Sequence, residues 1–423
     1  LKKNMLIHLK DILENYMIRI GKDSIIIVSL FFICFFGFYN FHINIYTMCL
    51  LVSIFTFFIK NQKISKEILF KNQWGFIIFI IMLFFATITS CDKYSSLKYF
   101  IMFCELFLCE YISVNKKNNK ICQIFIIFCW IEVICILLQS VGVGFIDTFN
   151  EYVLPNEMLK SMNNNINVTG SFSGIAGDLP NIMFFSTMIF MYYFICYIKK
   201  YDKKYIVYAI LGLISIFLCG KRSGIVILAI SLFLIYFLNM YVEKKINIKL
   251  LIALIFFCLI ALYLLYFTNM GDLILNKNNV LQKNGDASNG RIDLIKQMII
   301  IFKRSPIFGI GTLATNKYYG SVLGHNIYFQ ILSENGIVGF LALLYMLFNN
   351  FVYSIKRLKR IKYDEIKIDC LFAIAVQIFF IIYGCFGNPL YGTVFLIPYI
   401  VFSEMNIKLY LLENKLERIE EKE

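Results

Sequence analysis

Long runs of hydrophobic residues fill most of this chain, and short polar segments separate them. Each run holds about 16 to 21 residues, near the length that a helix needs to cross a hydrocarbon core of roughly 30 Å. Because a backbone in lipid must satisfy its own hydrogen bonds, such runs are expected to be helical. The pattern predicts an all-α integral membrane protein with about twelve transmembrane helices, near residues 24–39, 43–59, 74–90, 96–114, 121–141, 181–198, 205–219, 224–242, 249–269, 336–355, 367–385 and 391–410.

The composition agrees with a membrane protein and excludes a soluble domain. Of the 423 residues, 59% are hydrophobic and only 16% are charged, and the mean hydropathy is +0.71. Soluble domains are near half apolar and a quarter charged, so this chain is too apolar for water. Its net charge of +14 does not indicate a nucleic-acid partner, because no soluble folded part is expected to present a basic face.

Connections rich in Lys and Arg alternate with connections poor in them, as the positive-inside rule requires. Most of the 41 basic residues fall on one side of the predicted membrane, together with both termini. We therefore expect a multi-pass protein of the cell inner membrane, with a cytoplasmic tail at 411–423. Residues 1–23 place apolar side chains at helical spacing among charged ones, which favours an interfacial helix on the cytoplasmic leaflet.

Two connections are much longer than the others, and both fall on the outer side. The first, at 142–180, lies within the group of spans one to nine at 24–269. The second, at 270–335, joins span nine to spans ten to twelve at 336–410. Long loops in compact folds are usually functional or disordered, and the second loop carries helical signals of its own. We therefore expect the catalytic chemistry in the large outer loop.

This outer loop contains a predicted amphipathic helix at 289–304. Arg291 lies in its first turn, and Pro306 stops it. Gly309 and Gly311 follow, at a spacing suited to a tight and unusual backbone path. The predicted apolar stripe of the helix consists of Ile292, Ile295, Ile299 and Phe302.

A second helix of the loop is predicted to begin near His325, the only histidine in the loop. At a helix N-terminus the dipole disfavours the imidazolium, which keeps the ring neutral and able to accept a proton. The same helix end favours an anion, so one base beside one anion site suits group transfer from a phosphate-bearing donor. The other two histidines, His8 and His42, are interpreted as structural, and a structural role is the alternative for His325 as well.

The thirteen cysteines do not predict a disulfide framework or a metal site. Most lie inside apolar runs, where a thiol behaves as a small hydrophobic group. No pair has the Cys-x-x-Cys spacing, and no Cys and His cluster has zinc-like spacing. We expect no metal and no cofactor.

Four segments in order resemble the O-antigen polymerase and ligase superfamily (Wzy-like and WaaL-like proteins). Gly309-Ile310-Gly311 followed by Gly324-His325-Asn326-Ile327-Tyr328 and on to Gly339 is similar to the signature of that family. The other three are Gly170-Ser171-Phe172 with Pro180-Asn181, Cys219-Gly220-Lys221-Arg222-Ser223-Gly224, and Gly290-Arg291 with Pro306.

The resemblance implies a membrane glycosyltransferase of the kind called GT-C-like. Such an enzyme transfers glycan from an undecaprenyl-diphosphate carrier to a sugar hydroxyl on the outer face, with inversion and without a metal. His325 would deprotonate the acceptor, and Arg222 and Arg291 would bind the diphosphate, because a guanidinium forks onto phosphate oxygens. Supporting candidates are Lys221, Arg304, Glu334, Asn326 and Tyr328.

Each of these residues has a simpler interpretation. Arg222 could anchor a span at the lipid head groups, Arg291 could be a solvated charge, and Glu334 could cap or pair with a basic residue. Lys221 and Arg304 fit a head-group or solvated role at least as well. These alternatives stay open at the level of the sequence.

The motifs do not separate a polymerase of O-antigen or capsular repeat units from a ligase that moves finished glycan onto lipid A core or protein. We favour the polymerase, whose partners would be lipid-linked donor and acceptor oligosaccharides, membrane lipids, a chain-length regulator and a flippase. A flippase for the same lipid is the alternative from another class. Glu105 and Glu132 lie inside spans and could line such a path, but the elaborated outer loop favours a transferase.

Overall fold

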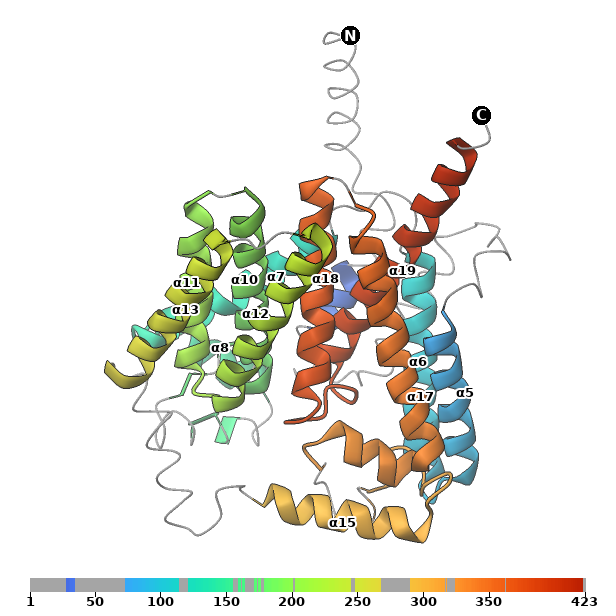
Figure 1. The fold of residues 1–423 in the computed structure, drawn as a ribbon. Coiled ribbons are helices and arrows are strands. Elements are labelled where there is room, and N and C mark those ends of the chain that lie inside the picture. Colours follow the sequence, from blue (N-terminus) through green and yellow to red (C-terminus); the bar gives the residue numbers. More distant parts are fainter. Residues whose placement is uncertain are drawn as a thin grey trace.

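The fold is described from a computed structural model of the protein, and its described elements are helices (Figure 1). The described residues are 28–34, 73–113, 121–154, 159–160, 162–163, 171–172, 174–175, 179–200, 202–244, 248–267, 290–315, 317, 324–361 and 363–420. In chain order the helices are α5 (Trp74–Thr89), α6 (Lys93–Ser113), α7 (Ile121–Ser140), α8 (Phe145–Val153), α10 (Leu179–Lys200), α11 (Lys204–Leu218), α12 (Arg222–Glu243), α13 (Ile248–Phe267), α15 (Arg291–Arg304), α17 (Ile327–Leu358), α18 (Asp364–Tyr383) and α19 (Thr393–Glu420).

The predicted spans from 74–90 onwards all coincide with helices of the structure. Of the first two predicted spans, only residues 28–34 are described, and they are helical. The predicted span at 43–59 and the predicted interfacial helix at 1–23 lie outside the described residues. The hydrophobic runs therefore locate the helices of the described part. Most ends differ by a few residues, but α17 begins earlier, at Ile327, and α19 continues to Glu420, into the predicted tail at 411–423.

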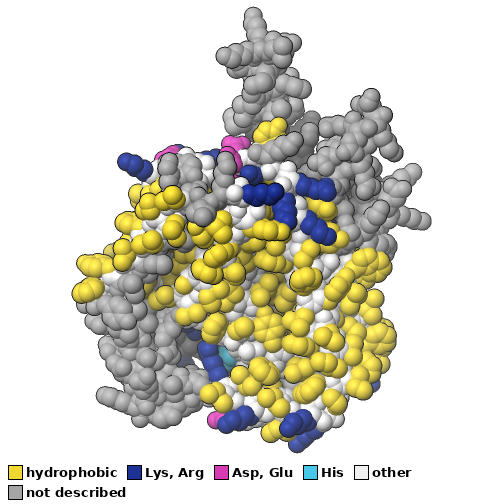
Figure 2. Space-filling model, viewed as in Figure 1, with side chains coloured by type: hydrophobic (Ala, Val, Ile, Leu, Met, Phe, Trp, Pro, Cys, Tyr) yellow, Lys and Arg dark blue, Asp and Glu magenta, His cyan; other side chains and the backbone are white. Residues whose placement is uncertain are grey.

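Five of the described helices are long and apolar enough to cross a membrane by length and composition: α7, α10, α17, α18 and residues Ser223–Glu243 of α12. Two shorter apolar helices, α5 and α11, accompany them. Figure 2 shows a broad belt of hydrophobic side chains between two ends that carry Lys and Arg. Large exposed apolar residues such as Phe233 and Phe348 belong to these helices. The arrangement is that of a multi-pass membrane protein, while the full number of twelve spans stays a prediction.

The basic connections of the described helices meet at one end of the bundle. Lys199 at the end of α10 pairs with Glu243 at the end of α12, and Lys367 near the start of α18 lies 3.5 Å from the same carboxylate. Lys359 at the end of α17 donates to Tyr241 at 2.7 Å. His325 precedes the opposite end of α17. The structure thus separates the Lys-rich connections from the end that carries His325, and the positive-inside rule predicts the former to be cytoplasmic.

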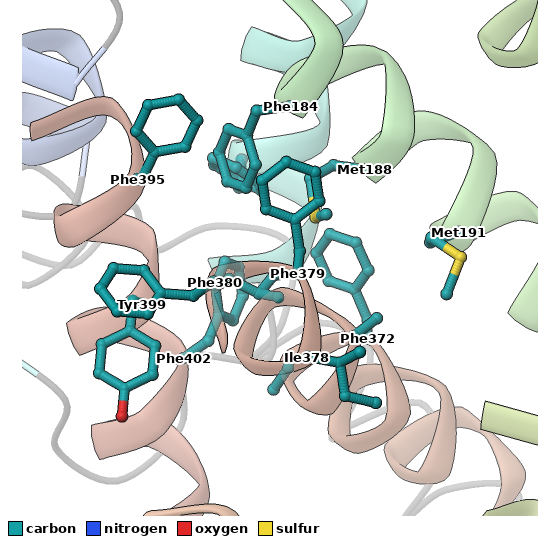
Figure 3. Packing of buried hydrophobic residues seen from close by; sticks show 14 of the residues in the cluster. Phe184, Met188, Met191, Phe372, Ile378, Phe379, Phe380, Phe395, Tyr399 and Phe402 are labelled. Atoms are coloured by element: carbon teal, nitrogen blue, oxygen red, sulfur yellow. The ribbon is translucent and has the colours of Figure 1, made fainter. Parts of the chain in front are cut away.

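Aromatic side chains from α7, α10, α18 and α19 fill the centre of the bundle. Phe184 of α10 has its ring centroid 4.9 Å from that of Phe379 in α18 and 5.3 Å from that of Phe395 in α19, and Figure 3 shows these rings facing one another. Aromatic pairs at such separations prefer tilted or edge-to-face geometry and stabilise packing beyond the area they bury. This rigid centre fixes the ends of α18 and α19 beside the start of α17.

Helix α15 lies across one end of the bundle, at a steep angle to the upright helices (Figure 1). It contacts α17 and spans Arg291–Arg304, as the position of Pro306 predicted. The buried residues of this helix are Met298 and Ile301. Of the predicted apolar stripe, Ile295, Ile299 and Phe302 are partly buried and Ile292 is 56% exposed. The buried face is therefore shifted around the helix from the predicted stripe, because docking against the start of α17 selects it.

Helix α17 is kinked at Gly336, which has φ 65 and ψ −170 inside an otherwise helical run. The sequence predicted a short helix before this glycine and span ten after it, and the kink separates these two parts. A side chain at Gly336 would approach the backbone N of Phe308 to 2.6 Å. Across the kink, the N–H of Ile337 donates to the carbonyl of Pro306 at 2.9 Å. The first part of α17 is thereby turned to lie over the end of the bundle.

Gly336→Ala is therefore expected to destabilise the protein. Its backbone conformation is almost restricted to glycine and costs other residues on the order of 1–3 kcal/mol, before the collision with residues 307 and 308 is added. Thermal unfolding of the purified protein in detergent should show a lower midpoint than for the unchanged chain. Gly144→Ala is the control, because its φ is −65 and no atom lies within 4 Å of an added Cβ. An equal midpoint for both variants would contradict this account of the kink.

Candidate functional site

The candidate site is built around the start of α17. Asn326 is the N-cap of this helix, and its side-chain oxygen accepts hydrogen bonds from the backbone N–H groups of Tyr328 and Phe329. This is the usual way in which an Asn satisfies the free donors of a first turn. His325 comes directly before the cap and has φ 50. A left-handed conformation is uncommon for residues other than glycine, though His is among those that adopt it more often.

The end of α18 holds the start of α17 in place. The N–H of Ile327 donates to the carbonyl of Gly384 at 2.9 Å. The side-chain amide of Asn326 donates to the carbonyl of Cys385 at 3.3 Å, and the hydroxyl of Tyr328 donates to the carbonyl of Ile381 at 2.7 Å. Asn326 and Tyr328, both supporting candidates from the sequence, therefore have a structural explanation: they fix the helix that follows His325.

Two basic residues from distant parts of the chain act on His325. Arg291 is the first residue of α15, and Lys221 is the N-cap of α12. His325 is exposed, and in Figure 2 histidine atoms lie in a hollow of the surface beside Lys and Arg side chains. Partial burial lowers the pKa of His325, and the positive charges of Arg291 and Lys221 lower it further. These causes favour the neutral imidazole, the form that the sequence predicted for His325.

The other two basic candidates are placed differently. Arg222 is the first residue of α12, next to Lys221, and its side chain lies outside what the structure describes. Arg304 is the last of the 14 residues of α15. At about 1.5 Å rise per residue it lies roughly 20 Å from Arg291 along the helix. The structure thus brings Arg291 and Lys221 to His325 and leaves Arg304 at the far end of α15.

Glu334 is buried and surrounded by donors. Its carboxylate accepts from the N–H of Leu313 at 2.9 Å and from the hydroxyl of Tyr391 at 2.5 Å. It also accepts from Thr315 and from the side-chain amide of Gln330 at 2.5 Å. The sequence left open a capping or pairing role for Glu334, and these contacts favour a role in positioning. Three of these donors were not singled out from the sequence: Gln330, Thr315 and Tyr391. Only Gln330 could have been found from the sequence, because it lies one helical turn before Glu334 on the same face of the helix.

The two glycines after α15 have the unusual backbone that was predicted. Gly309 has φ 71 and Gly311 has φ 108. The N–H of Gly311 donates to the carbonyl of Glu334 at 2.7 Å, so this segment passes directly against the kink of α17. The N–H of Cys91, in the turn between α5 and α6, donates to the carbonyl of Ile310 at 3.0 Å. Residues 309–311 therefore lie between α17 and the turn that joins α5 to α6.

Part of the first outer loop also reaches this end of the bundle. The N–H of Phe172 donates to the carbonyl of Leu218 at 3.1 Å, three residues before Lys221. Gly174 is held by Gln139, whose side-chain oxygen accepts from its N–H at 2.9 Å, and by Asn150, which donates to its carbonyl at 2.8 Å. The segments at 171–172, 219–224 and 324–339 that carried the family resemblance therefore lie at one end of the bundle.

Glu132, whose role was left open by the sequence, belongs to the support of this loop. It is fully buried in α7, and a Cβ on Gly174 would come within 2.9 Å of its carboxyl carbon. Its side chain thus lies against the described part of the first outer loop.

The pH dependence of activity should reveal the effect of the Lys221 charge on His325. The acid limb is the part of the profile where activity falls as the pH drops. The neutral imidazole is the form that accepts a proton, so activity falls as the pH drops through the pKa of His325. Because the Lys221 charge lowers that pKa, Lys221→Gln should raise it and move the acid limb to higher pH. The measurement is kcat against pH for glycan transfer in membranes. Lys303→Gln should leave the limb in place, because Lys303 is near the other end of α15 from Arg291 and is not among the charges that lower the pKa of His325.

An unmoved limb in Lys221→Gln would show that this lysine does not act on the imidazole. A limb that moves in both variants would point to a general effect of net charge.

The bundled apolar helices indicate a multi-pass membrane protein. Its candidate site lies at the end of the bundle away from the Lys-rich connections. Residues 207–344 match the family model described as O-antigen ligase. The predicted resemblance is confirmed over this range: residues 207–344 are similar to the O-antigen ligase and polymerase superfamily. The match covers all eight candidate site residues, while the segment at 170–181 lies outside it.

A protein of Haemophilus influenzae is similar to this chain over 206 residues, with 29% identity. Its name is given as "Uncharacterized protein". The alignment covers 41% of this chain and spans about half the length of that relative, 49%.

Proposed function

We propose that this protein polymerises the lipid-linked repeat units of an O-antigen or a capsular polysaccharide on the outer face of the inner membrane. The donor is glycan on an undecaprenyl-diphosphate carrier, and the acceptor is a sugar hydroxyl of another lipid-linked repeat unit. The observation that carries the proposal is the meeting of Arg291 and Lys221 at His325, at the end of the bundle away from the Lys-rich connections.

The reaction is a single displacement at the anomeric carbon of the donor. His325 accepts the proton of the acceptor hydroxyl while the oxygen of that hydroxyl bonds to the anomeric carbon. At the same time the bond between the anomeric carbon and the diphosphate oxygen breaks. The leaving diphosphate departs with its negative charge, which Arg291 and Arg222 stabilise by forked hydrogen bonds. Attack from the side opposite the leaving group inverts the anomeric configuration.

The electrostatics of the site suit these roles. A base must be unprotonated to act, and the lowered pKa of His325 keeps it so at neutral pH. The same cations that lower this pKa attract a diphosphate, so one arrangement serves both requirements. Apolar helices beside the site offer a surface for the polyprenyl tail.

A ligase that moves finished glycan onto lipid A core or protein is the second candidate, and the description of the matched family favours it. It would use the same base and the same cations with a different acceptor. A flippase is less well supported, because the described candidates Arg291, Lys221 and His325 lie together at one end of the bundle rather than along a path through it.

A glycan ladder on a gel separates these functions. The strain that lacks the gene is compared with the same strain complemented by the unchanged protein. Collapse of the ladder to a single repeat unit, restored by complementation, supports the polymerase. A full ladder that stays on the polyprenyl carrier supports the ligase, and a normal ladder in the correct place would exclude both.

A further inference from the structure

A buried line of hydrogen bonds connects Glu334 to the residue before His325. The side-chain amide nitrogen of Gln330 donates to Glu334 at 2.5 Å. The oxygen of the same amide accepts from the backbone N–H of Gly324 at 2.8 Å. Gln330 and Glu334 are both fully buried, so water does not compete for these contacts.

The carboxylate decides which way the Gln330 amide points. A glutamine side chain has one donating end and one accepting end, and an ionised carboxylate only accepts. Glu334 therefore takes the nitrogen end, which also contacts the hydroxyl of Thr315 at 2.5 Å. The oxygen end is left for Gly324.

The carboxylate itself cannot turn. The N–H of Leu313 and the hydroxyl of Tyr391 donate to its other oxygen. The backbone N–H has no second orientation, so that oxygen must remain an acceptor. Two donors on each oxygen therefore keep both oxygens of Glu334 as acceptors.

His325 needs such support because of its backbone. Its φ of 50 is unfavourable for a residue with a Cβ and persists only where its surroundings hold it. Asn326 on one side is fixed as the N-cap of α17. Gly324 on the other side is fixed through its N–H by Gln330.

We propose that Glu334 and Gln330 are positioning residues for His325: the carboxylate orients the Gln330 amide, and that amide holds Gly324 and the left-handed backbone that presents the imidazole. This inference rests on the proposed function, since it assumes that His325 acts as the base. Neither residue touches the reacting atoms.

Glu334→Gln is the test variant, because it keeps the size and removes one acceptor. The new amide must keep its oxygen toward Leu313, so its nitrogen faces the nitrogen of Gln330. If Gln330 then turns over, its nitrogen faces the N–H of Gly324. A displacement of about 1 Å in a reacting group can cost about a hundredfold in rate, so kcat should fall about a hundredfold while KM for the lipid-linked substrate stays unchanged.

The double variant Glu334→Gln with Gln330→Glu should restore activity. The carboxylate is then at position 330, where one oxygen accepts from Gly324 and the other accepts from the new amide at 334. We expect kcat within about tenfold of the unchanged protein. The assay uses membranes of the deletion strain that carry each variant, with lipid-linked repeat units extracted from that strain.

Glu404→Gln is the matched control. Glu404 is also buried, and it accepts from the amide of Gln73 at 2.5 Å at the start of α5, the end of that helix away from the site. The side-chain oxygen of Gln73 has no hydrogen-bond partner among the described residues. In Glu404→Gln the Gln73 amide can therefore rotate, so that its oxygen accepts from the nitrogen of the introduced glutamine. This variant should keep full activity.

Each outcome bears on a separate claim. A normal kcat in Glu334→Gln, or failure of the double variant to recover with protein present at the usual level, overturns the positioning role. Loss of activity in Glu404→Gln to the same extent would indicate a general response to buried substitutions and would overturn it too. Full activity in His325→Ala would instead remove the base of the proposed function, and the positioning role with it.

Discussion

Replacing His325 by Ala is expected to lower the rate of glycan transfer by about 10²–10⁴-fold, the usual contribution of a general base. Without the imidazole, the acceptor hydroxyl must lose its proton to water while it attacks. The helix start itself should survive, because Asn326 still caps α17. The measurement is the initial rate of chain growth from lipid-linked repeat units, in membranes with equal amounts of protein.

His325→Asn serves as the second variant for this prediction. Asn adopts the left-handed backbone more readily than Ala, so it keeps the conformation at φ 50 while it removes the base. Both variants should lose the same large factor. Retention of the full rate in either one would exclude His325 as the base, and a loss in Ala alone would assign the effect to the backbone.

Arg291→Ala should lower the rate of transfer by about 10²–10³-fold, as removal of one donor to developing negative charge typically does. The guanidinium binds the diphosphate as it leaves, so the loss should appear mainly in kcat. Arg291→Lys should recover only part of the rate, since an ammonium keeps the charge but not the forked geometry. Rates are measured as for His325.

Lys303→Ala is the control for charge on the same helix. It removes one positive charge near the far end of α15, where the side chain is exposed. Its rate should match that of the unchanged protein. If Lys303→Ala lost as much as Arg291→Ala, the effect would belong to the stability or net charge of α15 rather than to a contact with the diphosphate.

The pH dependence of the Arg291 variants gives a further prediction. Arg291 also lowers the pKa of His325. In Arg291→Ala that pKa should therefore be higher, and His325 should become the neutral base only at higher pH. Its acid limb should move upward, as in Lys221→Gln. In Arg291→Lys the charge remains, and the limb should stay near its original position.

Much of the fold followed from local pattern. The runs from 74–90 to 391–410 all became helices, because a run of apolar residues of that length has no other way to satisfy its backbone in lipid. The end of α15 before Pro306 and the left-handed glycines at 309 and 311 also depend on single residues and their neighbours. The motif around His325 was visible for the same reason, as its residues are close in the chain.

The buried face of α15 shows where local pattern fails. Most apolar residues of this helix lie on one half of its surface, and the sequence favoured the stripe within that half that includes Ile292. The structure buries Met298 and Ile301 instead, because Met298 lies against Gly324. That neighbour comes from another part of the chain, so no reading of the helix alone could select the face.

The sequence by itself determined which segments of the described part are helical and which residues are candidates for the site, since both depend on residue type and short-range spacing. Only the tertiary structure decided that Arg291 and Lys221 share the surroundings of His325 while Arg304 does not. It also decided that Glu334 is buried among donors from Leu313, Thr315, Gln330 and Tyr391. These contacts join segments far apart in the chain, and the packing of helices against one another sets them.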